Sequence, residues 1–80
     1  MKYILFEDFS GMPVPFIFPD RVDHADMREQ MPYTLVLAAG YVHMRQGQFY
    51  CHGGAPELEA TARTEDAAII RDFFLRDEAE

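Results

Sequence analysis

The chain has 80 residues, of which fourteen are Asp or Glu and seven are Lys or Arg, so its formal net charge is −7. This length fits one domain, and we predict that residues 1–80 form a single compact unit. Apolar residues make up 49% of the chain, which argues against disorder. The acidic balance disfavours direct binding to nucleic acid or to an anionic membrane.

Two short β-rich segments open the chain, at residues 2–9 and 13–18. Pro13 and Pro15 are two positions apart, so their missing N–H donors lie along one side of a strand. A two-residue turn at Ser10-Gly11 puts both prolines in pairs that exchange no backbone hydrogen bonds. The sequence therefore predicts a hairpin whose second strand is a blocked edge of the sheet.

A short helix is predicted after this hairpin. Asp23 is a suitable N-cap, and Val22 and Met27 have the spacing of a hydrophobic staple. Because Pro32 disfavours helical backbone in the residue before it, we expect the helix to end near Gln30, after about two turns.

A second hairpin is predicted from residues 34–44 and 48–52, turning at Gln46-Gly47. This register separates an apolar face from a polar and aromatic face. The apolar face holds Val42, Met44, Phe49 and Cys51. The polar face holds Tyr41, His43, Arg45, Gln48, Tyr50 and His52. Leu35 and Leu37 have the parity of the polar face, so either both faces are covered there or a bulge near Ala38-Gly40 reverses the strand.

The last third of the chain predicts one more short strand and a helix. Residues 57–62 alternate as in a strand, and Thr64 is a candidate N-cap for a helix over residues 65–76. Its apolar stripe consists of Ile69, Ile70, Phe73 and Phe74. The expected fold is α+β in the order β-β-α-β-β-(β)-α. It is a small antiparallel sheet of four to five strands with two helices on one face.

Candidate catalytic and metal sites are weak. Cys51 and His52 are neighbours in a strand, so their side chains point to opposite faces and cannot form a nucleophile–base pair. A structural zinc site needs about four ligands, often in tight pairs, whereas only His43 and His52 share a face, and His24 lies elsewhere. We therefore predict no catalytic residue, no metal and no cofactor.

The polar face of the second hairpin is the most informative cluster. Tyr, His and Arg side chains are typical of protein interfaces, so its six residues predict a protein-binding surface. There is no carboxylate between Gln30 and Pro56. Acidic residues near the C-terminal helix form a predicted steering surface: Glu65, Asp66, Asp72, Asp77 and Glu78.

These features predict a small acidic protein-binding module without enzymatic activity. One version is an inhibitor that occupies a basic or nucleic-acid-binding surface of another protein, as phage anti-defence proteins of the anti-CRISPR type do. A second hypothesis is a small-ligand-binding or enzymatic domain using His43, His52 and Tyr41. A third is a homodimeric accessory protein. The lone Cys51 fits a reducing compartment, so we expect a cytoplasmic location, in a native or a host cell.

Overall fold

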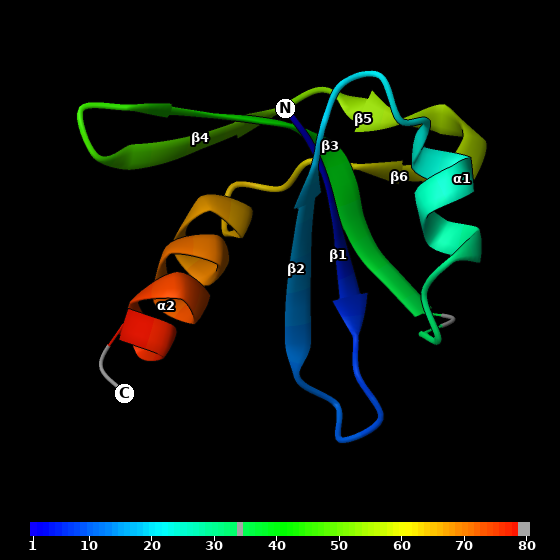
Figure 1. Ribbon diagram of the computed structural model, residues 1–80, viewed down its shortest axis with the longest axis horizontal. Helices are drawn as coiled ribbons and strands as arrows, with labels where there is room; N and C mark the ends of the chain where they lie inside the picture. The colour runs from blue at the N-terminus through cyan, green and yellow to red at the C-terminus, as the bar shows by residue number, and fades with distance from the viewer. Residues whose placement is uncertain (34, 79–80) are drawn as a thin grey trace.

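A computed structural model describes residues 1–33 and 35–78, and the side chains of residues 1–33 and 35–75 (Figure 1). The fold is α+β and antiparallel, as predicted. In chain order the elements are β1 (Lys2–Glu7), β2 (Pro13–Phe18), α1 (His24–Glu29), β3 (Leu35–Arg45), β4 (Gln48–His52), β5 (Gly54–Ala55), the 3-10 helix η1 (Pro56–Leu58), β6 (Ala60–Thr61) and α2 (Asp66–Glu78). Among the described residues, no helix has the length and apolarity that a membrane crossing requires.

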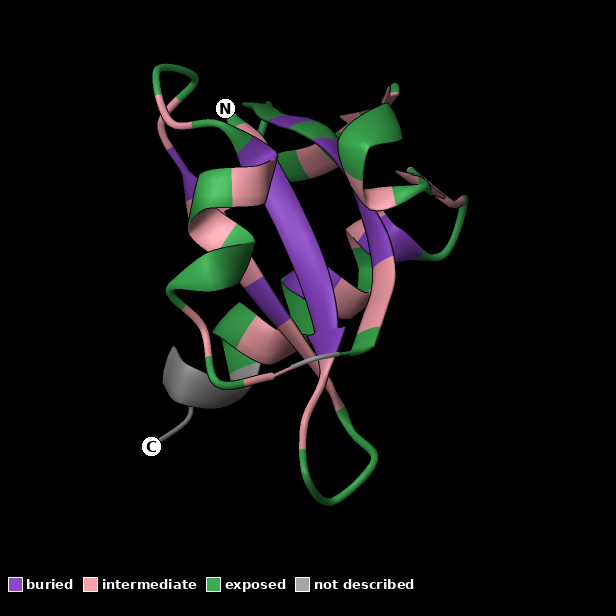
Figure 2. Ribbon diagram, turned by 90° about the vertical axis from the view of Figure 1, so that its right-hand side faces the viewer, coloured by how far each residue is buried: buried purple, intermediate pink, exposed green. Residues whose placement is uncertain are grey.

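Strand β1 is the centre of the molecule. The main sheet has the order β2-β1-β3-β4, and β5 pairs with β6 in a separate two-stranded sheet. Four consecutive residues of β1, from Tyr3 to Phe6, are completely buried, and Figure 2 shows this strand as buried over most of its length. Because neighbouring side chains of a strand point to opposite faces, both faces of the sheet must be covered.

The two helices cover opposite faces, so the prediction of both helices on one face is wrong. Tyr3 and Leu5 pack with Ile70 of α2, in a cluster that we call the α2-side core. Ile4 and Phe6 pack with Phe18 and, around it, residues of α1 and η1, in what we call the α1-side core. In Figure 1 the helices lie on either side of β1 and β2. The physical reason is the uninterrupted apolar run of β1, which one layer of helices cannot cover.

The first hairpin differs in register from the prediction. Glu7 pairs with Pro13 and Leu5 with Pro15, whereas the predicted turn at Ser10-Gly11 would pair Asp8 with Pro13 and Phe6 with Pro15. Five residues, Asp8 to Met12, join the two strands, and the Asp8 carboxylate closes this loop by accepting from the N–H groups of Met12 and Ser10, both at 2.9 Å. These hydrogen bonds hold the pKa of Asp8 below its usual range.

The prolines keep the role that the sequence predicts for them. The N–H of Asp8 donates to the carbonyl of Met12, so the alternation of the ladder leaves Pro13 and Pro15 in pairs without backbone hydrogen bonds. Their missing donors face outward, and β2 is an edge strand, as predicted. Pro parity thus identified the edge, while the Asp8 side chain set the loop length.

The other local predictions hold in most details. Helix α1 begins after Asp23 and ends before Gln30, although the Asp23 side chain makes no capping hydrogen bond. The second hairpin has the predicted pairs, including Val42 with Cys51 and Met44 with Phe49, but its predicted first residue, Thr34, lies outside the described residues. At the start of β3 a bulge occurs at Leu37, one residue before the predicted position. Val36 and Leu37 pack against opposite cores, whereas Leu35 is 53% exposed, so both faces are covered there only in part.

The segment after β4 is more divided than predicted. The expected strand over residues 57–62 is instead η1 followed by β6, and β6 pairs with β5. Helix α2 begins at Asp66, and its capping contact comes from the carboxylate of Asp66, which accepts from the N–H of Arg63, rather than from Thr64. In the predicted stripe Ile70 is buried, Ile69 and Phe73 are half-buried, and Phe74 is 38% exposed.

Helix α2 should be held mainly by Ile70. We expect Ile70→Ala to lower the free energy of unfolding by about 3 kcal/mol, because it removes a fully buried side chain and leaves a cavity. Urea denaturation followed by circular dichroism measures this change. Leu75→Ala, at a position that is 53% exposed on the same helix, serves as the control and should cost less than about 1 kcal/mol. Equal effects of the two substitutions would contradict this account of the core.

Candidate protein-binding arm

The second hairpin projects beyond the rest of the sheet. β3 pairs with β1 only as far as Tyr41, and from Tyr41 to Arg45 it pairs with β4. We call residues 41–52 the arm, which extends over α2 in Figure 1. At its base, a Cβ atom on Gly40 would lie 2.6 Å from the carbonyl oxygen of His52, so only glycine fits there.

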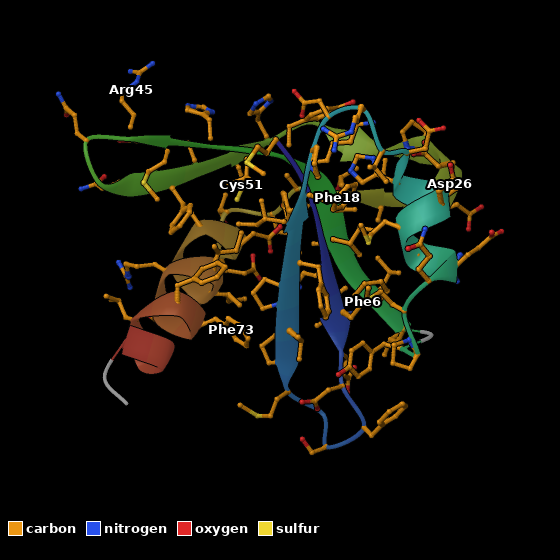
Figure 3. All side chains as sticks on the ribbon, viewed as in Figure 1. Phe6, Phe18, Asp26, Arg45, Cys51 and Phe73 are labelled. Carbon is orange, nitrogen blue, oxygen red and sulfur yellow. The ribbon has the colours of Figure 1, made fainter. Side chains whose placement is uncertain are left out.

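The outer face of the arm is the predicted polar face, and it is exposed. Its side chains form three cross-strand pairs: Tyr41 with His52, His43 with Tyr50, and Arg45 with Gln48. Tyr41 is 37% and Tyr50 42% exposed. All six side chains therefore meet on one face, as predicted, and Figure 3 shows Arg45 pointing away from α2.

Ring stacking orders this outer face. The rings of Tyr41 and His52 stack with their centroids 5.8 Å apart. The rings of His43 and Tyr50 stack at 5.4 Å. The guanidinium carbon of Arg45 lies 6.0 Å from the Tyr50 ring centroid, at the outer limit of a cation–π contact. Cross-strand neighbours of this kind hold one another in place, so the face is pre-organised.

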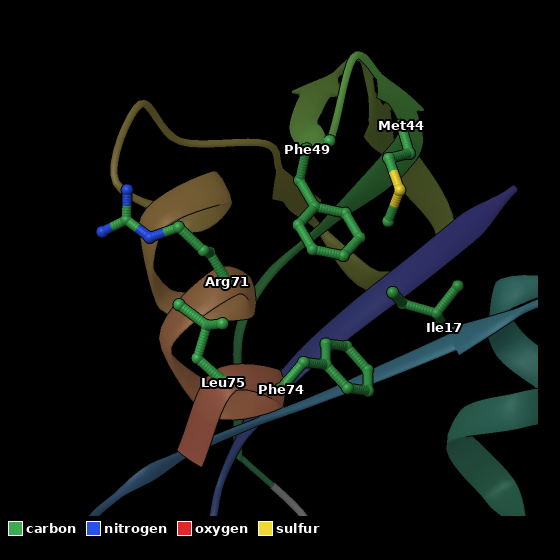
Figure 4. Close-up of a pocket in the computed structure, with 7 residues that line it drawn as sticks. Ile17, Met44, Phe49, Arg71, Phe74 and Leu75 are labelled. Atoms are coloured by element: carbon green, nitrogen blue, oxygen red, sulfur yellow. The ribbon is translucent and has the colours of Figure 1, made fainter. Parts of the chain in front are cut away.

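The inner face of the arm borders an open apolar groove. Met44 and Phe49 from the arm meet Phe74 and Leu75 from α2 and Ile17 from β2 around a cavity of about 620 Å³ (Figure 4). The rings of Phe49 and Phe74 stack at 6.0 Å, yet Met44 is 61% exposed. The sequence predicted an apolar face here but not an open groove, because it does not show that α2 leaves the end of the arm uncovered.

The buried histidine has a structural position. His24 is 2% exposed, and its Nε2 lies 2.9 Å from the carbonyl oxygen of Gly40. Its Nδ1 lies 3.5 Å from Oε1 of Glu57, and its ring meets the edge of Tyr41 at 5.8 Å. His24 thus joins α1 and η1 to the base of the arm and is separate from the exposed His43 and His52.

Asp66 is not part of an acidic surface, so that prediction is wrong. Its side chain is completely buried, and it accepts a hydrogen bond from the hydroxyl of Tyr3. The N–H of Arg63 donates to it at 2.8 Å and Nε of Arg63 at 2.9 Å. In a capping box, the acidic side chain accepts a hydrogen bond from the backbone N–H of the residue three positions earlier, as Asp66 does here. The carboxylate at the helix start is therefore an internal cap.

Burial changes the acidity of the groups around Asp66. Burial raises the pKa of the Tyr3 hydroxyl well above its ordinary value, and the hydrogen bond to Asp66 adds to the rise. Burial likewise raises the pKa of the half-buried Cys51 thiol. A thiol with a raised pKa is a poor nucleophile, so Cys51 acts as a small packing residue of the α2-side core.

The remaining acidic residues are only partly described. Glu65 is 58% and Asp72 69% exposed, and each lies beside an arginine, at 3.7 Å from Arg63 and 3.1 Å from Arg71 respectively. The side chains of Asp77 and Glu78 lie outside the described residues. The described part of this acidic surface therefore consists of Glu65, just before α2, and Asp72 on α2.

Within the described part of the chain, no three His, Cys, Asp or Glu side chains are grouped so that they could hold a metal ion. Comparison with protein-family models, with curated proteins and with solved structures finds no significant match to this chain. The arm, with its ordered outer face and open groove, is accordingly the candidate functional site on geometric grounds.

The burial of the Tyr3 hydroxyl, together with its hydrogen bond to Asp66, predicts a loss of stability at high pH. The pKa of Tyr3 is raised in the folded protein, so the protonated hydroxyl stabilises the fold. This contribution to the free energy of unfolding is fully present at pH values below the ordinary tyrosine pKa of about 10. It is lost as the pH rises above that value, because the unfolded chain then releases a proton that the folded protein keeps. The slope approaches about 1.4 kcal/mol per pH unit.

Urea denaturation at a series of pH values from neutral to strongly alkaline measures this slope. Tyr3→Phe should remove most of it, whereas Tyr50→Phe, at an exposed position, should leave it in place. A wild-type slope that survives in Tyr3→Phe would show that other groups cause the alkaline loss.

Proposed function

We propose that the chain is a small acidic protein-binding module that acts by placing the outer face of the arm against another protein. One observation carries the proposal: six exposed side chains of interface type stand in three registered cross-strand pairs on a projecting hairpin. Tyr and Arg are enriched in interface hot spots, and together with His they supply both apolar contact and hydrogen-bonding groups.

The stacking of the outer face supports this proposal energetically. Binding costs conformational entropy for every side chain that must be immobilised. Two of the three pairs are already stacked, at 5.8 and 5.4 Å, so less freedom remains to be lost on association. The arm also carries little charge, because the chain has no carboxylate between Gln30 and Pro56 and its one fixed charge there is Arg45. Its contact face therefore avoids the cost of burying unpaired carboxylates.

The charge of the rest of the chain favours a basic partner. The formal net charge is −7, and two acidic side chains are exposed near the arm, Glu65 just before α2 and Asp72 on α2. Acidic residues around a near-neutral contact face increase the rate of encounter with a positive surface. We propose that the partner is a basic or nucleic-acid-binding protein in the cytoplasm, which the module inhibits by covering its surface.

Affinity capture tests the contact face. A tagged wild-type chain should retain a partner from lysate of the cells that express it, and the Tyr50→Ala/His52→Ala variant should lose that partner at least tenfold, as removal of interface anchors does. Both positions are exposed, so the melting temperature should change little.

The matched control is Phe9→Ala/Met12→Ala. These residues are exposed in the β1–β2 loop, at 83% and 53%, and lie away from the arm. This control should capture the partner as well as wild type does. Equal capture by both variants, or equal loss, would refute the assignment of the interface to the outer face. Unfolding of the Tyr50→Ala/His52→Ala variant would show that the face is structural.

Charge reversal on α2 tests the steering. With the captured partner in hand, Glu65→Lys/Asp72→Lys should lower the association rate constant several-fold at low ionic strength and have little effect at high salt. Stopped-flow or surface plasmon resonance measures these rates. Asp20→Lys/Glu29→Lys, which makes the same change in net charge away from α2, should slow association less. Equal slowing by both pairs would contradict a local steering surface.

A further inference from the structure

The outer edge of β4 carries backbone groups with no partner among the described residues. Val42 exchanges two hydrogen bonds with Met1, at 2.7 and 3.0 Å, so its backbone N–H and C=O face β1. Val42 is paired with Cys51 in β4, and because the backbone groups of Val42 face β1, this is a non-hydrogen-bonded pair. In a non-hydrogen-bonded pair the N–H and C=O groups of both residues point away from the partner strand. The N–H and C=O of Cys51, and by the two-residue alternation those of Phe49, therefore face outward from the sheet.

The two edges of the main sheet are treated differently. On β2, Pro13 and Pro15 remove outward donors, which blocks pairing with another strand. On β4, the five residues from Gln48 to His52 contain no proline, no lysine and no carboxylate, and the strand has no bulge. Edge strands of this kind are sites of strand addition unless something blocks them. The sheet thus has one blocked edge and one edge that is open from Gln48 to His52 and closed just beyond it, where the carbonyl of Gly53 accepts from the N–H of Ala62 at 2.9 Å.

We infer that β4 pairs with β4 of a second copy of this chain, antiparallel and centred on Tyr50. In this register Phe49 of one copy lies opposite Cys51 of the other. Because both residues present outward backbone groups, each such pair exchanges two hydrogen bonds, and the two-fold axis repeats them. Tyr50 then faces its own copy, and Gln48 faces His52, so no like charges oppose each other at neutral pH.

Several features favour a second copy as the occupant. The paired strands themselves carry no carboxylate, since none lies between Gln30 and Pro56, and the exposed Glu65 and Asp72 are each paired with an arginine, which reduces repulsion between the copies. A cleft of about 360 Å³ lies beside the edge, and it is lined by Gln48, Phe49, Thr64, Ala67, Ala68 and Arg71. It can accept a side chain of the added strand. With only one open edge per chain, pairing stops at the dimer.

This dimer would unite the two outer faces. In each copy the rings of His43 and Tyr50 are stacked. The two-fold axis would place the two stacked pairs side by side, with the Tyr50 residues at the centre, and so form one aromatic surface. The inference rests on the edge and is independent of the proposed function. It is tested with the purified chain alone, so a failure to capture a partner does not affect it.

Light scattering and sedimentation equilibrium first test the oligomeric state. The wild type should dissociate from dimer to monomer on dilution. Phe49→Pro should be monomeric, because it removes an outward donor and leaves the hydrogen bonds between β3 and β4 intact. Phe49→Ala keeps that donor and should remain dimeric. A wild type that is monomeric at every accessible concentration would overturn the inference, as would a Phe49→Pro variant that is folded and dimeric.

Disulfide trapping then tests the register, in a Cys51→Ser background. Across a non-hydrogen-bonded pair the Cα atoms are about 4.5 Å apart, within disulfide range, so Tyr50→Cys should cross-link to its own copy under mild oxidation. Gln48→Cys alone and His52→Cys alone should not, because the identical residues lie roughly 13 Å apart along the strands. A mixture of these two variants should give the mixed disulfide. Self-linking of Gln48→Cys would refute this register.

Discussion

The burial of β1 on both of its faces is the constraint from which the rest of the structure follows. Four adjacent side chains of this strand are fully removed from solvent, two on each side. A chain of 80 residues has little surface to spare for burial, so each remaining element must cover one face. α2 covers Tyr3 and Leu5, while α1 and η1 cover Ile4 and Phe6. The result is a sheet between two unequal layers.

The same constraint places a polar group in the core. Tyr3 is fully buried, so its hydroxyl needs a hydrogen-bond partner, and the carboxylate of Asp66 supplies it. That carboxylate also caps α2 through Arg63. One contact therefore fixes the start of α2 against the central strand and removes Asp66 from the surface where the sequence alone had placed it.

The arm exists because β3 is longer than its central neighbour. β3 has eleven residues and β1 has six, so the end of β3 has only β4 as a strand partner. α2 covers the base of this hairpin and leaves Met44 exposed near its end. The outer face of the arm and the end of its inner face are thus presented to solvent on a strand pair anchored in the core. A rigid base and an uncommitted end suit the contact role that we propose for the arm.

The sequence by itself determined the local features. Proline parity identified the blocked edge, Gln46-Gly47 fixed the register of the second hairpin, and alternation put the six outer-face residues together. Each depends on backbone chemistry or on neighbours a few residues away. Tertiary structure alone decided the placement of the helices on opposite faces, the burial of Asp66 and the exposure of Met44. These depend on which distant segments compete to cover the same apolar surface, and a local pattern does not contain that competition.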